Sequence, residues 1–203
     1  MMETAIAFSR YLIALLFGSA LAVRFAGMTG TRKNNLAFGG FVLALFVLQL
    51  FCLKTWGMAV TLKIYPLISH LPVAVFIALY LKRTWLISFT SMFVSFLCCQ
   101  PPRWIGAVAG EIYASVAADH TLYILSAFLT YFLLDRYALG SVRHLMERSV
   151  KSCLLFGAMP ALYYLFDYTA TVYTSFLYSG TRAAMHFMPS AAATFYFVFV
   201  RLY

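Results

Sequence analysis

Apolar residues come in long blocks that follow one another along nearly the whole chain, and the charges are confined to the short stretches between them. The sequence is 64% hydrophobic and 10% charged, whereas a soluble domain carries about 25% charged residues. So few charges do not supply a polar surface for a globule in water, but a lipid bilayer requires none. The pattern predicts an all-α, polytopic membrane protein that contacts membrane lipids.

The blocks divide into about seven predicted spans, because a spanning helix needs roughly 20 apolar residues. Residues 54–63 are expected to form a loop, and residues 100–103, with two prolines, to break a helix. The apolar run 104–118 is short for a span, so we interpret it as an interfacial or re-entrant helix, with a full span as the alternative. The expected spans are 5–26, 36–53, 64–81, 85–99, 121–134, 152–168 and 183–200.

Two further patterns concern helix faces. Small residues recur every fourth position at Gly106, Gly110, Ala114 and Ala118, which predicts close approach of another helix. Residues 135–151 alternate basic and apolar side chains, which is typical of an amphipathic helix lying on the membrane.

The basic residues set the predicted orientation. With seven spans, ten of them fall on the side that holds the carboxyl end and five on the other, which predicts an N-out, C-in protein. The formal charge of +9 is dispersed singly or in pairs, so we expect no nucleic-acid partner. Arg10 and Arg24 are expected to extend toward lipid headgroups, with pairing to a membrane acid as the alternative.

No pattern of catalytic or metal-binding residues is present in the sequence. Cys52, Cys98, Cys99 and Cys153 lie in or beside apolar blocks, as packing residues do, and a redox role for the adjacent Cys98 and Cys99 is the alternative. The chain has no metal-ligand spacing, nucleophile–base pair or phosphate-binding glycine loop. We therefore predict no catalytic residue, no metal and no cofactor.

The candidate ligand-binding residues are Tyr163, Tyr164, Asp167, Thr171 and His70. An acid near membrane depth is expensive and is often functional. On a helix, the two tyrosines lie one turn before Asp167 and Thr171 one turn after it, so they can surround a ligand; an aromatic belt with a solvated acid is the alternative. His70 lies between two prolines that can bend a helix near a cavity, although an inert histidine bonded to a neighbouring carbonyl is the simpler interpretation.

Three stretches resemble the N-terminal membrane sensor region of bacterial sensor histidine kinases with a GHKL-type ATPase domain, a group that includes peptide-pheromone receptors. They are residues 63–72, 98–104 and 153–157 leading into 163–168. The resemblance implies one transmembrane sensor domain over residues 1–203, located in the bacterial cytoplasmic membrane. It would detect an extracellular or membrane cue and pass it through the last helix to a cytoplasmic kinase.

The same resemblance implies partners. They are an extracellular peptide or small amphiphile, a second copy in a homodimer, and a response regulator reached only through a kinase domain that these 203 residues lack. Enzyme activity would require that domain, and we expect the chain to be the membrane portion of a longer protein. A small transporter or channel-like protein is the main alternative, and a lipid-modifying enzyme is another.

Overall fold

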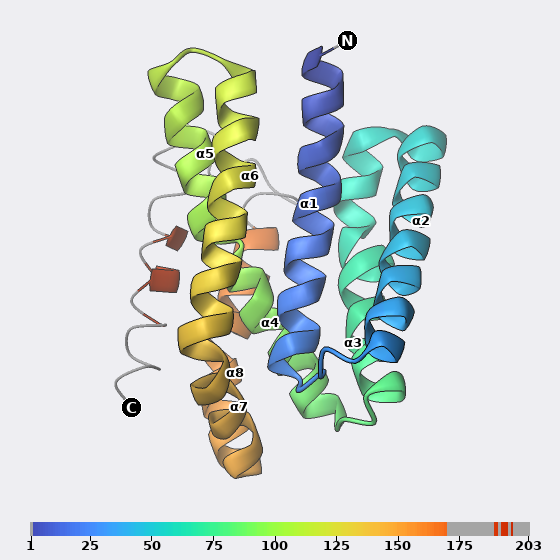
Figure 1. Ribbon diagram of the computed structural model, residues 1–203, viewed down its shortest axis with the longest axis vertical. Coiled ribbons are helices and arrows are strands. Elements are labelled where there is room, and N and C mark those ends of the chain that lie inside the picture. The colour runs from blue at the N-terminus through green and yellow to red at the C-terminus, as the bar shows by residue number, and fades with distance from the viewer. Residues whose placement is uncertain (1, 170–188, 191, 195, 197–203) are drawn as a thin grey trace.

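The computed structural model describes residues 2–169, 189–190, 192–194 and 196. Within these residues the chain forms helices joined by short turns, with no strand, so the predicted all-α class is confirmed. The helices run back and forth along one axis and form a bundle (Figure 1). The first helix, α1 (Met2–Phe25), runs along the bundle and ends at the loop 26–31.

Gly57 reverses the direction of α2 (Arg32–Tyr65). Its φ of 75° and ψ of 174° form a backbone conformation that is essentially restricted to glycine. The chain then returns through a π-helix, η1 (Pro66–His70), into α3 (Leu71–Tyr80) (Figure 1). The predicted loop 54–63 is therefore wrong, because helix continues on both sides of a single glycine.

Two side-chain hydrogen bonds hold the two arms of this hairpin together. Near the middle, the Gln49 amide of α2 donates to the Ser69 hydroxyl of η1. Near the open end, the Tyr80 hydroxyl donates to the Asn34 side chain at 3.1 Å. Gln49 is completely buried, so its bond to Ser69 fixes the register of the two arms at the level of η1.

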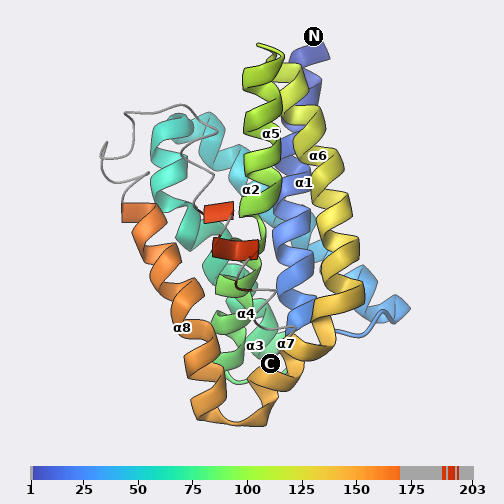
Figure 2. The same ribbon diagram turned by 90° about the vertical axis from the view of Figure 1, so that its left-hand side faces the viewer.

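α4 (Trp85–Cys98) and α5 (Gln100–Ile112) follow one another in the same direction (Figure 2). Pro101 and Pro102 lie in the first turn of α5, where a missing N–H costs no helical hydrogen bond. The expected break at 100–103 is thus limited to the junction between α4 and α5. Residues 104–118 do not form one helix, because up to Ile112 they belong to α5, which extends the path of α4, and from Val116 they belong to the next helix.

The return path consists of α6 (Val116–Leu133), a second π-helix η2 (Leu134–Ala138) and α7 (Leu139–Arg148). The amphipathic pattern predicted here is present, but its apolar face meets protein and not the membrane surface. Val142, Leu145 and Met146 are buried in the main core, together with residues of α1, α4 and α8. After a turn at Ser149, α8 (Val150–Asp167) runs back along α4.

Glycines let α5 and α6 pack closely, as the small-residue pattern predicts. A Cβ atom added to Gly106 would lie 2.8 Å from the backbone oxygen of Asp119, and one on Gly110 would lie 2.8 Å from the Asp119 Cβ atom. Ala114 and Ala118 do not continue this contact surface, because Ala114 lies in the turn with a φ of 46° and Ala118 belongs to α6.

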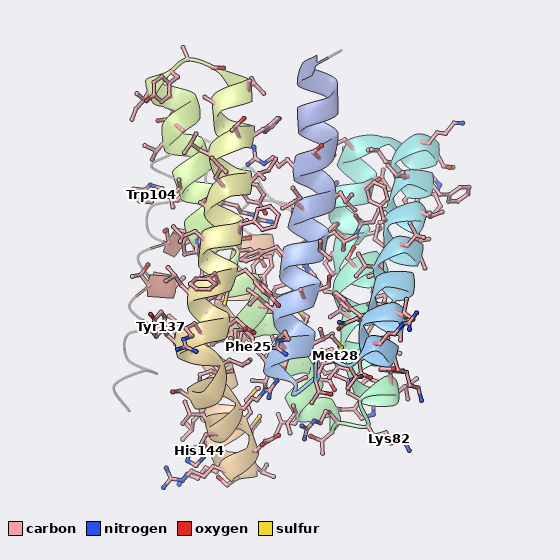
Figure 3. The ribbon with its side chains drawn as sticks, viewed as in Figure 1. Phe25, Met28, Lys82, Trp104, Tyr137 and His144 are labelled. Atoms are coloured by element: carbon pink, nitrogen blue, oxygen red, sulfur yellow. The ribbon has the colours of Figure 1, made fainter. Side chains whose placement is uncertain are left out.

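Basic side chains gather at one end of the bundle, which we call the basic end. This end holds the loops 26–31 and 81–84 and the turn at Ser149, and Figure 3 shows Lys82 and His144 there. The opposite end holds the start of α1, Gly57 and the turn 113–115. The basic residues in or beside the three connections of the basic end are Arg24, Arg32, Lys33, Lys82, Arg83, Arg143, Arg148 and Lys151.

Two helical segments are long and apolar enough to cross a membrane, Arg32–Tyr80 and Val116–Arg148, in a search limited to the described residues. The first is the hairpin folded at Gly57, so its 49 residues pass along the bundle twice. The predicted span 5–26 coincides with α1 and the predicted span 152–168 with α8. Most of the predicted span 183–200 lies outside the described residues.

Candidate functional site

Two prolines shape the chain at His70. Pro66 and Pro72 have no N–H to donate, and the intervening turn widens so that the Leu71 N–H donates to the Pro66 carbonyl, five residues earlier. This wide turn is η1, and it places Ser69 and His70 on the inner side of the bundle, where both line a cavity. A cavity does lie beside the two prolines, and His70 bonds the Tyr164 hydroxyl and not a neighbouring carbonyl.

Four aromatic rings surround the His70 imidazole. The ring centroids of Tyr65, Phe96, Tyr164 and Tyr168 lie 5.0, 5.5, 5.3 and 6.0 Å from that of His70, and all four meet it edge to face. The Tyr164 hydroxyl also hydrogen-bonds the His70 Nδ1 atom at 2.7 Å. The histidine is thus held in place by contacts from the end of α2, from α4 and from α8, and it links η1 directly to α8.

An acid and an arginine lie beside this aromatic group. On α8 the Tyr163 hydroxyl donates to the Asp167 carboxylate at 3.4 Å, one helical turn away. On α5 the Arg103 guanidinium lies over the face of Phe96, 5.7 Å from the ring centroid. Arg103 and Asp167 also interact electrostatically through space, although their side chains do not form a direct ion pair.

The cavity itself has a volume of about 50 Å³ and lies between α1, η1 with α3, α4, α5 and α6. This volume is enough for a few water molecules or a very small ligand. Its polar wall includes His70, Arg103 and the fully buried Tyr123. The other lining residues are Ala14, Leu15, Gly18, Ser19, Tyr65, Ser69, Val73, Met92, Ser95, Phe96 and Cys99.

Four of the five candidate residues from the sequence meet in this one region. His70 and Tyr164 are in direct contact, Tyr163 bonds Asp167, and both pairs belong to the aromatic group around Phe96. Thr171, the fifth candidate, lies outside the described residues. Whether these residues bind a ligand stays a prediction.

Sequence reasoning missed Arg103, Tyr65, Phe96 and Tyr123. It placed Arg103 in a helix break, although the arginine belongs to a helix whose first residue, Gln100, is completely buried. The available signal was that prolines in a first turn begin a helix as readily as they end one. Tyr65 and Tyr123 offered no signal, because only the fold brings the end of α2 and α6 to one cavity.

Two arginines of α1 pair with acids of α6 and η2, which corrects the expectation that they extend to headgroups. Arg10 lies 2.8 Å from the Asp119 carboxylate and 2.6 Å from the His120 Nδ1 atom, and Arg24 lies 2.8 Å from the Asp135 carboxylate. α1 runs in the same direction as the continuous path of α6 and η2 (Figure 1), so the two ion pairs join α1 to this path near opposite ends of the bundle.

The carboxyl end of α1 receives a further basic side chain. Arg143 of α7 donates two hydrogen bonds to the Arg24 carbonyl, at 2.9 and 2.7 Å. This carbonyl belongs to the last turn of α1 and also accepts a bond from the Gly27 N–H at 3.0 Å, so the guanidinium adds to the cap of the helix. Together with Arg24–Asp135, the cap fastens α1 to the lower part of the α6–α7 path.

The four cysteines are buried and unpaired by disulfides, as expected for packing residues. Among the described residues, no cluster of three or more His, Cys, Asp or Glu side chains is arranged to hold a metal ion. The chain matches no protein-family model, no curated protein and no solved structure.

Proposed function

We propose that this chain is the membrane-embedded sensor module of a bacterial sensor histidine kinase with a GHKL-type ATPase domain. It crosses the cytoplasmic membrane about seven times and passes a signal through its last helix to the kinase. The main support is the polar, aromatic-lined cavity at His70 and Arg103. Polar and charged groups inside an apolar helix bundle are costly, and they usually mark a ligand or ion site.

The residues that line the cavity come from several helices, so a ligand bound there contacts several helices at once, as a sensor requires. A ligand there would touch α1, α3, α5 and α6, and through His70 and Tyr164 it would also act on α8. A small change in His70 therefore alters the relation of α8 to the rest of the bundle. Differential contacts of this kind are what a ligand needs to shift a conformational equilibrium.

The basic end supports the proposed orientation, because an excess of Lys and Arg marks the cytoplasmic side of a membrane protein. We expect a cysteine in place of Gly30, at the basic end, to be protected in intact cells from a membrane-impermeant maleimide. A cysteine in place of Tyr113, at the opposite end, should react. Both positions are exposed, and the four native cysteines are buried, so background labelling should be low.

Permeabilised cells provide the control for this labelling, because both introduced cysteines should then react. Labelling of the Gly30→Cys variant and not of the Tyr113→Cys variant in intact cells would reverse the orientation. Labelling of both in intact cells would contradict the crossing pattern.

The kinase function is tested first by reading the DNA past the Tyr203 codon in the same frame. That frame should encode a dimerisation helix and an ATP-binding domain, and the purified protein in lipid nanodiscs should autophosphorylate. We expect His70→Phe to change the autophosphorylation rate about fivefold or more, since couplings between linked sites typically reach this size. The matched control is His144→Phe, at an exposed position of α7, which should leave the rate unchanged.

Transport is the second candidate function, and the interrupted helix at Pro66–His70 favours it. Transporters place binding sites at such discontinuous helices, where freed backbone groups face a cavity. A reading frame with no kinase, together with flux of a small solute in proteoliposomes that His70→Phe abolishes, would establish transport in place of signalling.

A further inference from the structure

Arg103 differs from the arginines of the bundle that form ion pairs. Arg10, Arg24 and Arg83 each have a carboxylate oxygen within 3.0 Å. Among the described residues Arg103 forms no such ion pair, and its guanidinium lies over the face of Phe96. A guanidinium has five N–H groups and is always charged, so an anion in the cavity would neutralise the charge of Arg103 and accept its hydrogen bonds.

None of the remaining polar groups of the cavity wall supplies a negative charge to the Arg103 guanidinium. The Ser19 and Ser95 hydroxyls donate to carbonyls of their own helices at 2.6 and 2.8 Å, and the Cys99 thiol donates to the Ser95 carbonyl. Asp167 does not line the cavity and accepts a bond from Tyr163. The charge presented to the cavity is therefore a single positive one, with the Tyr65 and Tyr123 phenols, the Ser69 hydroxyl and the His70 ring beside it.

The rest of the wall is apolar and the space is small. Leu15, Val73, Met92 and Phe96 face the same cavity as Arg103. At about 50 Å³ the cavity accepts about three to five non-hydrogen atoms, since one water needs about 10–15 Å³ by this measure. One positive charge matches a monoanion better than a dianion, and an apolar wall matches a short hydrocarbon.

We propose that this cavity binds a short monocarboxylate of about two or three carbons, with its carboxylate on the Arg103 guanidinium and its hydrocarbon part against Met92 and Phe96. The planar guanidinium fits a carboxylate with two parallel hydrogen bonds. The inference deepens the proposed function, on which it rests for its role as a signal, by naming the class of cue. Binding itself does not depend on a kinase.

The test uses the full-length protein in nanodiscs of neutral lipid, with sodium propionate as the probe. Propionate should raise the melting temperature of the wild type in a saturable manner. Arg103→Met should weaken binding at least tenfold, as expected for the loss of a charge-assisted hydrogen bond, and Arg103→Lys should recover part of it. Arg83→Met is the matched control, because Arg83 pairs with Glu147 away from the cavity and should bind as the wild type does.

A second variant keeps the charge and removes the space. Ala14 lines the cavity from α1, and Ala14→Leu should abolish propionate binding while Arg103 remains. Should Arg103→Met fail to fold, this variant still decides the question. The proposal is overturned if neither acetate nor propionate binds to the wild type, or if phosphate or decanoate binds in their place. It is also overturned if the Arg103→Met and Ala14→Leu variants bind propionate as the wild type does.

The two proposals fail in different ways. Propionate binding without any effect on autophosphorylation would leave the carboxylate site intact and count against the sensor function. Autophosphorylation that responds to His70→Phe, in a protein that binds no short carboxylate, would leave the sensor function intact and remove this ligand class.

Discussion

Asp119→Asn is expected to lower the free energy of unfolding by about 3 kcal/mol, the lower part of the range for breaking a buried ion pair. The substitution preserves the shape of the side chain but leaves the Arg10 charge beside His120 without a carboxylate. Asp119 is 5% exposed and packs against Gly106, and the Arg10 side chain is 24% exposed, so the pair is largely removed from water. The measurement is reversible unfolding of the purified protein in a mild detergent.

The double variant Arg10→Met with Asp119→Asn shows whether the uncompensated charge is the cause. Removing both charges should recover most of the lost stability, because a buried pair contributes little beyond its own desolvation cost. The exposed pair Arg83–Glu147 is the comparison, and Glu147→Gln should cost less than about 1 kcal/mol. Equal losses in Asp119→Asn and in the double variant would mean that packing, and not charge, explains the effect.

The helices themselves were largely predictable from sequence, because their signals are local. Apolar runs set the lengths of α1 and α8, and the glycines at 106 and 110 indicated a close helix contact. The errors also have local causes. Gly57 reverses the chain in one residue, so the polar side chains around it looked like a loop although they belong to helix.

The ion pairs were not predictable, because nothing local connects their members. Arg10 and Asp119 are 109 positions apart, and only the packing of α1 beside α6 brings them together. The π-helix η2 contains Asp135 and rotates the helix face by its wider turn, which an α-helical periodicity does not anticipate. The same reason applies to Arg103 and Tyr123, which reach one cavity from different helices.

The half of the candidate site that was predicted consists of residues that lie close together in the sequence and whose chemistry can be recognised there. An acid with tyrosines one turn away on α8 and a histidine between prolines are visible in the sequence. The structure adds that these two features belong to one site, through the contact of Tyr164 with His70. That contact spans 94 positions and has no sequence signal.

Gly106→Ala is expected to cost about 1–3 kcal/mol or more, the range for overpacking a tight contact. The new methyl group would lie 2.8 Å from the Asp119 backbone oxygen and 2.6 Å from its Oδ1 atom. A backbone atom does not rotate away, so α5 must separate from α6 along the whole contact. Gly40→Ala is the control, since Gly40 in α2 has open space around it and alanine is the better helix former, so stability should rise by about 0.5–1 kcal/mol.

Gly157 provides a second comparison that separates backbone clashes from side-chain clashes. A Cβ atom on Gly157 would meet the Thr90 hydroxyl at 2.7 Å, and the nearby atoms all belong to that side chain. The single variant Gly157→Ala should therefore destabilise the protein. Adding Thr90→Ala, which removes the obstructing atoms, should restore the stability. Gly106→Ala has no such partner, because its obstruction includes the main chain of α6. Rescue of Gly106→Ala by a side-chain truncation at Asp119 would show that α5 and α6 are not held at the separation that this account requires.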